Sequence, residues 1–298
     1  MIGRRHFIAG CVAAITLPAL ARNQTDTAYR WAQADLTALD QALAELERAS
    51  RGRLGVGLLD TRSGQVAHYR GDERFLMLSS FKTLAAAYVL ARSDQGEDQL
   101  SRRISIAEAD ILEYAPVTRR HIGQQGMTLA ELCHATITTS DNTAANLILR
   151  SYGGPQALTQ FIRSLGDNVT RHDRYEPELN LSDSAEPMDT SSPNAMSNTL
   201  NTLLFGSALK PESRKLLQSW LTANTTGNRR LRAGVPSNWM VGEKTGTAPT
   251  GANDVGFVQA PGGSAVIVSV YLETDDVAAP ERDRIIAAVG TRVAGLVG

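Results

Sequence analysis

The stretch MVGEKTGTAPTGANDVGFVQAPGGSAVIVSVYL, residues 240–272, contains three runs of strand-forming residues. We predict strands over 240–247, 254–259 and 265–272, and the last two are joined by Pro261-Gly262-Gly263. Neighbouring strands that are connected by tight turns pair in the antiparallel direction. This stretch therefore predicts an antiparallel sheet.

Two further strands are predicted over 54–60 and 65–69, separated by a turn-rich segment. A helical stripe of leucines at 31–50 precedes them, and a helix over 281–297 closes the chain. The pattern predicts an α/β fold of the α+β type: an antiparallel sheet of about five strands, flanked by the N- and C-terminal helices, with an all-helical lobe inserted. The helices predicted for that lobe are 79–92, 128–139, 142–150, 155–165, 193–204 and 212–223.

Composition excludes several classes of protein. The chain has 298 residues, 42% of them hydrophobic, and its 30 Lys and Arg nearly balance its 31 Asp and Glu. This content is too apolar for a disordered chain, and no basic excess points to a nucleic-acid partner. The sequence contains no Gly-x-Ser-x-Gly elbow, no His-Glu-x-x-His, no phosphate loop and no dinucleotide fingerprint. We therefore expect no α/β-hydrolase fold, no metal and no cofactor.

The first 21 residues have the features of a cleaved secretory signal. Arg4-Arg5 precedes a short apolar stretch that ends in small residues at Ala21, and the arginine pair resembles a twin-arginine export signal. A lipoprotein cut before Cys11 is the alternative, although its apolar stretch is shorter than usual. We predict cleavage after Ala21, an exported, periplasmic protein, and no stable membrane insertion.

Ser79-Ser80-Phe81-Lys82 stands at the start of a predicted helix. Positions i and i+3 share one helical face, so Lys82 can reach the Ser79 hydroxyl and accept its proton if the lysine is neutral. The helix N-terminus also directs N–H groups toward a site where negative charge would develop. Taken alone, this short pattern is a weak signal and also fits a helix cap beside a solvated lysine.

Two other short motifs contain side chains that could take part in catalysis or in substrate binding. Ser140-Asp141-Asn142 stands at a break between two predicted helices, where these residue types are also ordinary helix caps. Lys244-Thr245-Gly246 lies on a predicted strand, where lysine supplies a positive charge and glycine leaves room for a ligand. The alternative for the second motif is a strand that ends in a turn.

In this order and these contexts, the three motifs resemble those of the penicillin-recognising serine enzymes. A fourth, Asp173-Arg174-Tyr175-Glu176-Pro177-Glu178-Leu179-Asn180 in the polar segment 167–192, resembles the Ω-loop motif of class A serine β-lactamases. The resemblance covers nearly all of residues 22–298. It implies hydrolysis of penicillins and related antibiotics, antibiotic resistance, and a monomer with its active site between two lobes. A DD-peptidase and a β-lactam sensor that stays acylated are the alternatives.

The resemblance implies the catalytic roles. Ser79 would attack the β-lactam carbonyl, with the backbone N–H groups of Ser79 and Thr247 as the oxyanion hole. Lys82 and Glu176 would share the proton transfers of acylation, and which of them is the base stays open. Glu176 would then activate the water that hydrolyses the acyl-enzyme, and Ser140 would relay a proton to the leaving nitrogen.

The resemblance also implies a substrate-binding set. Asn142 would bind the amide side chain of the substrate, and Lys244 and Thr245 its carboxylate. Arg230 would add a charge near that carboxylate, with a solvated arginine as the alternative, and Tyr114 would border the cavity or be a plain surface aromatic. The full set is Asn142, Asn180, Lys244, Thr245, Gly246, Thr247, Arg230 and Tyr114.

Two structural expectations complete the comparison with this family. An ion pair between Arg174 and Asp189 would close the neck of the loop and fix the position of Glu176. Cys133 lies on the apolar face of its predicted helix, so we expect a buried thiol without a disulfide partner. The lobes are predicted at about 22–76 plus 225–298 and at about 77–224.

Overall fold

Five antiparallel strands form the sheet in the order β2-β1-β9-β8-β7, which confirms the predicted five-stranded sheet. The computed structural model describes residues 30–123, 125–181 and 186–297. Pairing of β1 with β9 joins the beginning of this part of the chain to its end, and β7 is left at an edge. The strands are β1 (Arg53–Asp60), β2 (Val66–Tyr69), β7 (Met240–Ala248), β8 (Gly251–Gln259) and β9 (Ala265–Glu273).

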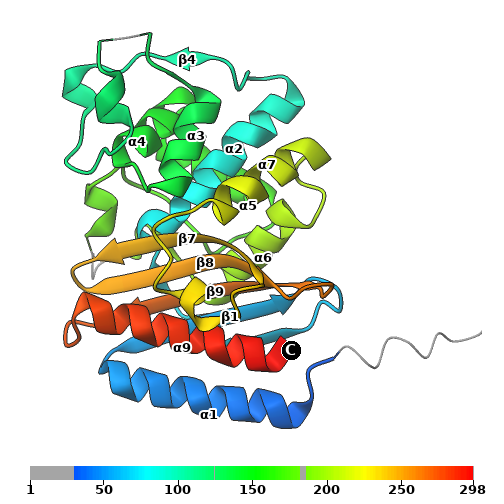
Figure 1. Cartoon of the computed structure of the whole chain (residues 1–298). Helices are drawn as coiled ribbons and strands as arrows, with labels where there is room; N and C mark the ends of the chain where they lie inside the picture. Colours follow the sequence, from blue (N-terminus) through cyan, green and yellow to red (C-terminus); the bar gives the residue numbers. More distant parts are fainter. Residues whose placement is uncertain (1–29, 124, 182–185, 298) are drawn as a thin grey trace, which may run out of the picture. The chain divides into compact units, whose positions relative to one another are not determined.

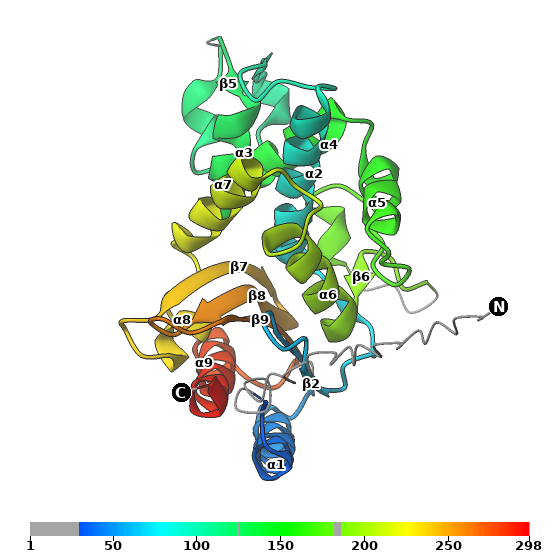
Figure 2. The same cartoon turned by 90° about the vertical axis from the view of Figure 1, so that its right-hand side faces the viewer.

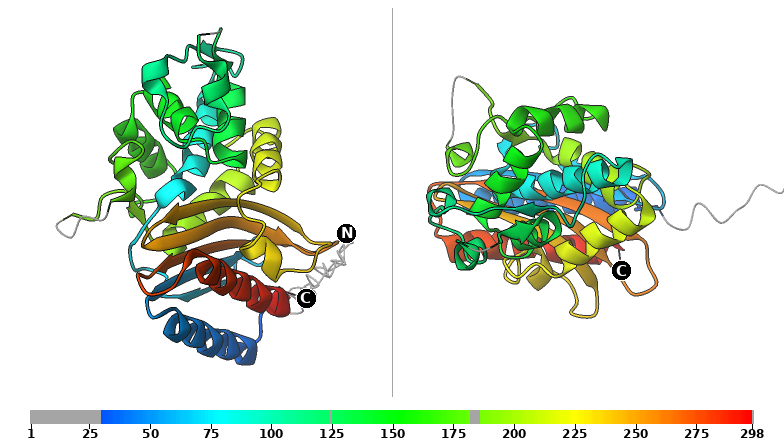
Figure 3. Two further views of the ribbon diagram at one scale, coloured as in Figure 1. Left: turned by 60° about the vertical axis from the view of Figure 1, so that its left-hand side comes forward. Right: turned by 90° about the horizontal axis from the view of Figure 1, so that it is seen from above.

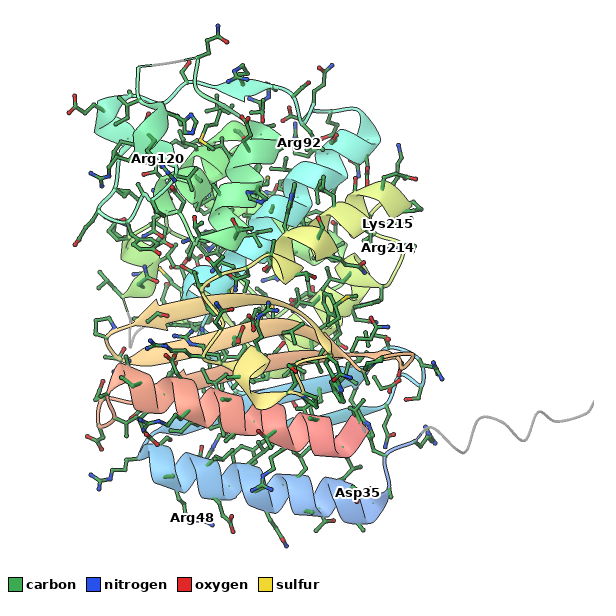
Figure 4. All side chains as sticks on the ribbon, viewed as in Figure 1. Asp35, Arg48, Arg92, Arg120, Arg214 and Lys215 are labelled. Carbon is green, nitrogen blue, oxygen red and sulfur yellow. The ribbon has the colours of Figure 1, made fainter. Side chains whose placement is uncertain are left out.

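The N- and C-terminal helices cover one face of the sheet, with a short helix beside them (Figure 1). They are α1 (Gln33–Ser50), α8 (Leu231–Gly234) and α9 (Ala279–Val297). Their apolar side chains pack with those of the strands into one core, which includes Leu43, Val268 and Ile286. The exposed Asp35 and Arg48 lie toward opposite ends of α1, where they complement the helix dipole (Figure 4).

The other face of the sheet carries the remaining helices (Figure 2). Helix α2 runs through the middle of this group (Figure 3), and its first seven residues are all buried. A second core, which includes Phe81, Leu132 and Tyr271, joins the helices to the sheet. The helices are α2 (Phe81–Gln95), α3 (Leu129–Thr138), α4 (Asn142–Ser151), α5 (Pro155–Ser164), α6 (Pro193–Leu204) and α7 (Pro211–Thr222).

Several short elements were not predicted from the sequence, because segments of two to four residues carry no periodicity. Two small ladders pair β3 (Phe75–Leu76) with β6 (Thr190–Ser191) and β4 (Arg103–Ile104) with β5 (Met127–Thr128). The described residues also form the 3₁₀ turns η2 (Leu78–Ser80), η3 (Glu108–Asp110), η4 (Thr118–His121) and η5 (Glu178–Asn180).

Three further points bear on the expectations. Cys133 is a free, buried cysteine, as predicted, and burial raises the pKa of its thiol. Among residues 30–123, 125–181 and 186–297, no helix combines the length and apolar character needed to cross a bilayer. The predicted signal, including Arg4-Arg5 and Cys11, lies outside the described residues.

Candidate active site

Ser79 lies in the 3₁₀ turn η2 that leads into α2, and not in the first turn of the helix as predicted. The preceding Leu78 has a φ of 48°, which is unfavourable for a leucine. The amide of Asn253 on β8 donates to the carbonyls of Leu76 (2.8 Å) and Met77 (3.0 Å) and thereby holds the turn. A Cβ on Gly246 would lie 2.8 Å from Leu78 Cβ, so glycine at this position lets β7 approach the turn.

Lys82 lies one turn further along α2 and is completely buried. Its Nζ is 2.9 Å from Ser79 Oγ, 3.3 Å from Ser140 Oγ and 2.5 Å from Asn142 Oδ1. It also forms an ion pair of 3.0 Å with Glu176 Oε1. Burial lowers the pKa of Lys82, although the charge of Glu176 acts in the opposite direction. When its amine is neutral, a lysine in this position can accept a proton from Ser79.

Glu176 lies on the Ω-like loop and is also buried. Its Oε1 accepts a hydrogen bond from Ser79 Oγ at 3.4 Å, and its Oε2 accepts one from Asn180 Nδ2 at 2.7 Å. Burial by itself would raise the pKa of Glu176, but the charge of Lys82 holds it below its usual value. The side chain is therefore a carboxylate that can accept a proton close to Ser79.

Asn146 was not predicted from the sequence, yet it fixes Glu176. Its Oδ1 accepts from Glu176 N and its Nδ2 donates to Glu176 O, both at 2.9 Å. The residue lies on α4, four positions after Asn142, so both amides lie on the same helical face. The sequence shows only the i, i+4 spacing of the two asparagines, which predicts a shared helical face but not the contact with Glu176.

Ser140 joins the two lysines. Lys244 Nζ donates to Ser140 Oγ at 3.0 Å and to the carbonyl of Thr245 at 2.7 Å. Burial lowers the pKa of Lys244 well below its usual value, and the charge of Lys82 lowers it further. Ser140 itself has a φ of 61°, and the neighbouring Asp141 caps α4 by accepting from Ala144 N at 2.9 Å. The Ser140-Asp141-Asn142 motif is thus both a helix cap and part of a charged cluster, which also contains Lys82, Glu176 and Lys244.

A cavity of about 370 Å³ opens onto this cluster, between edge strand β7 and the helical side of the molecule. Tyr114 is 51% exposed at its wall, and Thr226 is a lining residue that was not predicted. Thr226 Oγ1 is 2.5 Å from Thr245 Oγ1. Thr226 lies in a loop after α7, and because that loop has no periodicity, the sequence did not indicate that Thr226 belongs to the site. The lining residues are Ser79, Tyr114, Ser140, Asn142, Glu176, Asn180, Thr226, Thr245 and Thr247.

Arg230 lies behind this cavity and is only 6% exposed, so it is not a solvated arginine. Its Nε forms an ion pair of 2.7 Å with Asp283 on α9. Its Nη1 donates to the carbonyls of Gly246 and Asn253, both at 2.7 Å, and its Nη2 donates to Thr247 Oγ1 at 2.8 Å. Described residues thus accept four of its five N–H groups, which leaves one on Nη2, beside Thr247.

Comparison with known proteins identifies the family to which the chain is similar. Residues 38–296 match the family described as the beta-lactamase enzyme family. The chain is 43% identical to Beta-lactamase L2 of Stenotrophomonas maltophilia, over the whole of both chains. It is 42% identical to Beta-lactamase CTX-M-8 of Citrobacter amalonaticus, over 84% of this chain and 86% of that one.

Solved structures agree. An ancestral class A β-lactamase superimposes with a TM-score of 0.84 at 55% identity and covers 86% of this chain and 99% of its own. The chain belongs to the class A β-lactamase family. A β-lactamase from Xanthomonas campestris pv. campestris matches with a TM-score of 0.86 at 45% identity, over 89% and 99% of the two chains. The protein is thus a serine β-lactamase, and its reaction is the hydrolysis of β-lactams.

The Ω-loop of this β-lactamase is closed by the Arg174–Asp189 pair. Arg174 Nε lies 2.6 Å from Asp189 Oδ2, and Asp189 is fully buried. Asp189 Oδ1 also accepts from the backbone N–H groups of Asp173 (2.8 Å) and Arg174 (3.0 Å). The Glu176–Pro177 peptide bond is cis. The buried carboxylate therefore organises the backbone of the neck as well as pairing with an arginine.

His172 of the β-lactamase lies against this neck and was not singled out from the sequence. The ring is fully buried and stacks on Phe81, with centroids 4.2 Å apart. Its Nδ1 is 3.3 Å from Asp189 Oδ1, but neither ring nitrogen has an aligned hydrogen-bond partner in the described part of the chain. Burial lowers the pKa of His172 to about 3, so the imidazole is neutral in the folded enzyme.

Acidification should therefore destabilise the β-lactamase through His172. The unfolded histidine titrates at about 6.5, so below that pH the unfolded state binds a proton that the native state excludes. The free energy of unfolding should fall with decreasing pH by up to about 1.4 kcal/mol per unit from this residue. Urea unfolding of the wild type and of His172→Leu between about pH 7 and 5 measures the difference.

His68→Leu is the matched control, because His68 is exposed on β2. Its dependence on pH should follow the wild type, whereas His172→Leu should show a shallower slope. Equal slopes for all three proteins would contradict the assignment of a neutral, buried His172.

Proposed function

We propose that Ser79 is the nucleophile, and that the reaction proceeds through an acyl-enzyme at its Oγ. Attack forms the Ser79 Oγ–carbonyl carbon bond, and the hydroxyl proton passes to Lys82 or Glu176. The C–N bond of the β-lactam then breaks. Ser140 relays a proton to the departing nitrogen: it gives up its hydroxyl proton and regains one from Lys82, whose Nζ lies 3.3 Å from Ser140 Oγ. The observation that carries the proposal is the contact of Ser79 Oγ with both Lys82 Nζ (2.9 Å) and Glu176 Oε1 (3.4 Å).

The backbone N–H groups of Ser79 and Thr247 would stabilise the oxyanion. Both residues line the cavity, and they belong to η2 and β7, which approach each other at Gly246. Backbone donors that are fixed before the reaction stabilise developing charge without reorganisation. Asn253 and Arg230 both hold this junction, which supports a preorganised pair of donors.

Glu176 would activate the water that cleaves the acyl-enzyme, and Asn180 would help to hold it. Asn180 donates to Glu176 Oε2, and both side chains line the cavity. A second step that needs its own general base distinguishes a hydrolase from an enzyme that stays acylated. A buried carboxylate beside Ser79 therefore supports turnover over a β-lactam sensor.

Repeated turnover of benzylpenicillin tests this proposal. Protein comprising residues 22–298 should hydrolyse many equivalents of benzylpenicillin per equivalent of enzyme. Ultraviolet absorbance follows the opening of the β-lactam ring directly. A single stoichiometric burst without further hydrolysis would exclude the enzymatic mechanism and favour the sensor. Parallel assays with an oxyimino-cephalosporin and a carbapenem define the substrate range.

The substrate carboxylate would bind at the Lys244-Thr245-Gly246 strand. Thr245 and Thr247 present hydroxyl groups to the cavity, and Lys244 supplies a buried positive charge behind them. Arg230 would add the Nη2 N–H group that no described residue accepts, next to Thr247. Asn142, whose amide oxygen contacts Lys82, would keep its amide N–H groups for the substrate side chain near Tyr114.

Arg230→Met should raise KM for benzylpenicillin by about 10- to 100-fold, with a smaller change in kcat, because a charge-assisted hydrogen bond contributes roughly 1.5–3 kcal/mol. Steady-state kinetics with benzylpenicillin and with its methyl ester separate recognition of the carboxylate from loss of structure. The KM effect should be absent for the ester, which lacks the negative charge. The exposed Arg229→Met is the control. An equal KM increase for acid and ester would refute the carboxylate role.

We further propose that the enzyme is exported to the periplasm and acts there as a monomer. The Arg4-Arg5 pair and the following apolar residues support export, with cleavage after Ala21. Residues 22–298 would then form one catalytic domain with lobes at about 22–76 plus 225–298 and about 77–224. The two cores on opposite faces of the sheet support that division.

A further inference from the structure

Two buried carboxyl groups lie beneath the segment that carries Arg230. Glu243 on β7 and Asp254 on β8 are both completely buried. Asp254 is directly opposite Thr245 in the ladder, and residues two apart on a strand share a face. Glu243 and Asp254 are therefore diagonal neighbours on the face that packs against α8 and α9.

Two of the four carboxyl oxygens accept from an identified N–H donor. Glu243 Oε1 accepts from Arg232 Nε at 3.0 Å, and Asp254 Oδ2 accepts from the backbone N–H of Leu231 at 3.1 Å. Glu243 Oε2 and Asp254 Oδ1 receive no N–H donor from the described residues. The strand register places these two carboxyl groups side by side, and a hydrogen bond between them would require a proton on one of them, because ionised carboxylates only accept.

The contacts favour Asp254 as the group that would carry this proton. Glu243 forms an ion pair of 3.0 Å with Arg232, whereas Asp254 forms no ion pair with a described residue. Burial raises the pKa of Asp254 well above its usual value, and the charge of Glu243 raises it further, against the opposing charge of Arg230. With the proton on Asp254 Oδ1, all four oxygens have a partner, as buried polar groups require.

The pair fixes the backbone on the C-terminal side of Arg230. Leu231 and Arg232 follow Arg230 directly, and each is bound by one of the two acids. On the other side, Arg230 N donates to the carbonyl of Gly227 at 2.9 Å. A Cβ at position 227 would collide with the Glu243 carboxyl group, so glycine at this position lets the segment pack directly against the Glu243–Asp254 pair.

We propose that Asp254 is a positioning residue that stays protonated in the working enzyme, donates a hydrogen bond to Glu243 and thereby holds the 227–232 segment and Arg230 in place for the substrate carboxylate. The part played in binding the substrate carboxylate rests on the role proposed above for Arg230. Loss of the proton to solvent would leave two adjacent negative charges in a buried site, faced by Arg230 and Arg232 and, from the other face of β7, by Lys244.

Asp254→Asn is the decisive variant, because asparagine reproduces both hydrogen bonds of a protonated aspartic acid without a titratable proton. At about pH 8, far above the ordinary aspartate pKa of roughly 3.9, the wild type should show an infrared carbonyl band of a protonated carboxylic acid. Asp254→Asn should remove that band. The control Asp60→Asn changes a buried acid at the β1–β2 turn and should retain it.

Hydrogen exchange and kinetics test the positioning. Amide exchange in residues 227–234 should be as slow in Asp254→Asn as in the wild type and faster in Asp254→Leu. Asp254→Leu should also raise KM for benzylpenicillin about tenfold, as loss of one buried hydrogen bond would, while Asp254→Asn should not. If Asp254→Leu does not fold, the infrared band and the exchange and KM of Asp254→Asn still decide the matter.

The possible results separate this inference from the proposed role of Arg230. Absence of the band, or Asp254→Asn with fast exchange and a raised KM, would overturn the proton and the positioning. Normal KM in Asp254→Leu together with a raised KM in Arg230→Met would also overturn the positioning. The expected band and exchange, with an unchanged KM in both Arg230→Met and Asp254→Leu, would support the acid pair and refute only the carboxylate role of Arg230.

Discussion

Ser79→Ala should lower kcat for benzylpenicillin by about 10⁶-fold, because a group of residues that acts as one catalytic unit loses nearly all of its rate enhancement when the nucleophile is removed. Lys82 and Glu176 would remain in place, 3.0 Å apart, but neither would have a hydroxyl group to deprotonate. The cavity and its other polar groups would also persist, so substrate should still bind. Stopped-flow hydrolysis assays with a large excess of enzyme measure the residual rate.

Ser80→Ala is the matched control for this variant. Ser80 lies in the same turn, is buried, and donates to the carbonyl of Met77 at 2.6 Å, away from the catalytic cluster. Its loss should affect stability more than rate. A Ser79→Ala enzyme that retained more than about 1% of wild-type activity would show that another group performs the attack, since even general acid–base assistance is worth at least roughly 100-fold.

Glu176→Ala should separate the two halves of the reaction. Its carboxylate contacts both Ser79 and Asn180, so its removal leaves the water of the second step without a base. Steady-state kcat should fall by about 10²- to 10⁴-fold, the usual contribution of a positioned general base. Quench-flow experiments should then show a burst of one equivalent of ring-opened product followed by slow turnover.

Glu178→Ala provides the comparison. Glu178 lies two residues further along the same loop, is exposed, and does not line the cavity. Its rate should remain within a few-fold of wild type. If Glu176→Ala showed no burst and no slow phase, and deacylated as fast as the parent, then Glu176 would not be the base of the second step.

The sheet was predictable because its strands are long and joined by short turns. Residues 240–272 carried enough alternation and turn chemistry to give three of the five strands and their direction. The two-residue ladders β3–β6 and β4–β5 were not predictable, because they depend on tertiary contacts alone. For the same reason Ser79 was placed in a helix, although Leu78 adopts a positive φ that only its surroundings stabilise.

Short motifs marked the charged cluster, but not the groups that hold it. Ser79, Lys82 and Ser140 were visible as motifs of fixed spacing, and the structure brings them together around Lys82 Nζ. The contacts of Asn146 with Glu176 depend on how α4 packs against the loop. The two residues are about 30 positions apart in the sequence, and this separation does not predict that they touch. Glu243 looked like an ordinary charged residue of a strand, and only the fold buries it.

The central claim is that hydrolysis proceeds through an acyl-enzyme at Ser79. The most direct test is mass spectrometry of Glu176→Ala after brief mixing with benzylpenicillin. The intact protein should gain the mass of one penicilloyl group, and peptide mapping should locate the adduct on Ser79. Absence of an adduct, or an adduct on another residue that persists in Ser79→Ala, would contradict the mechanism.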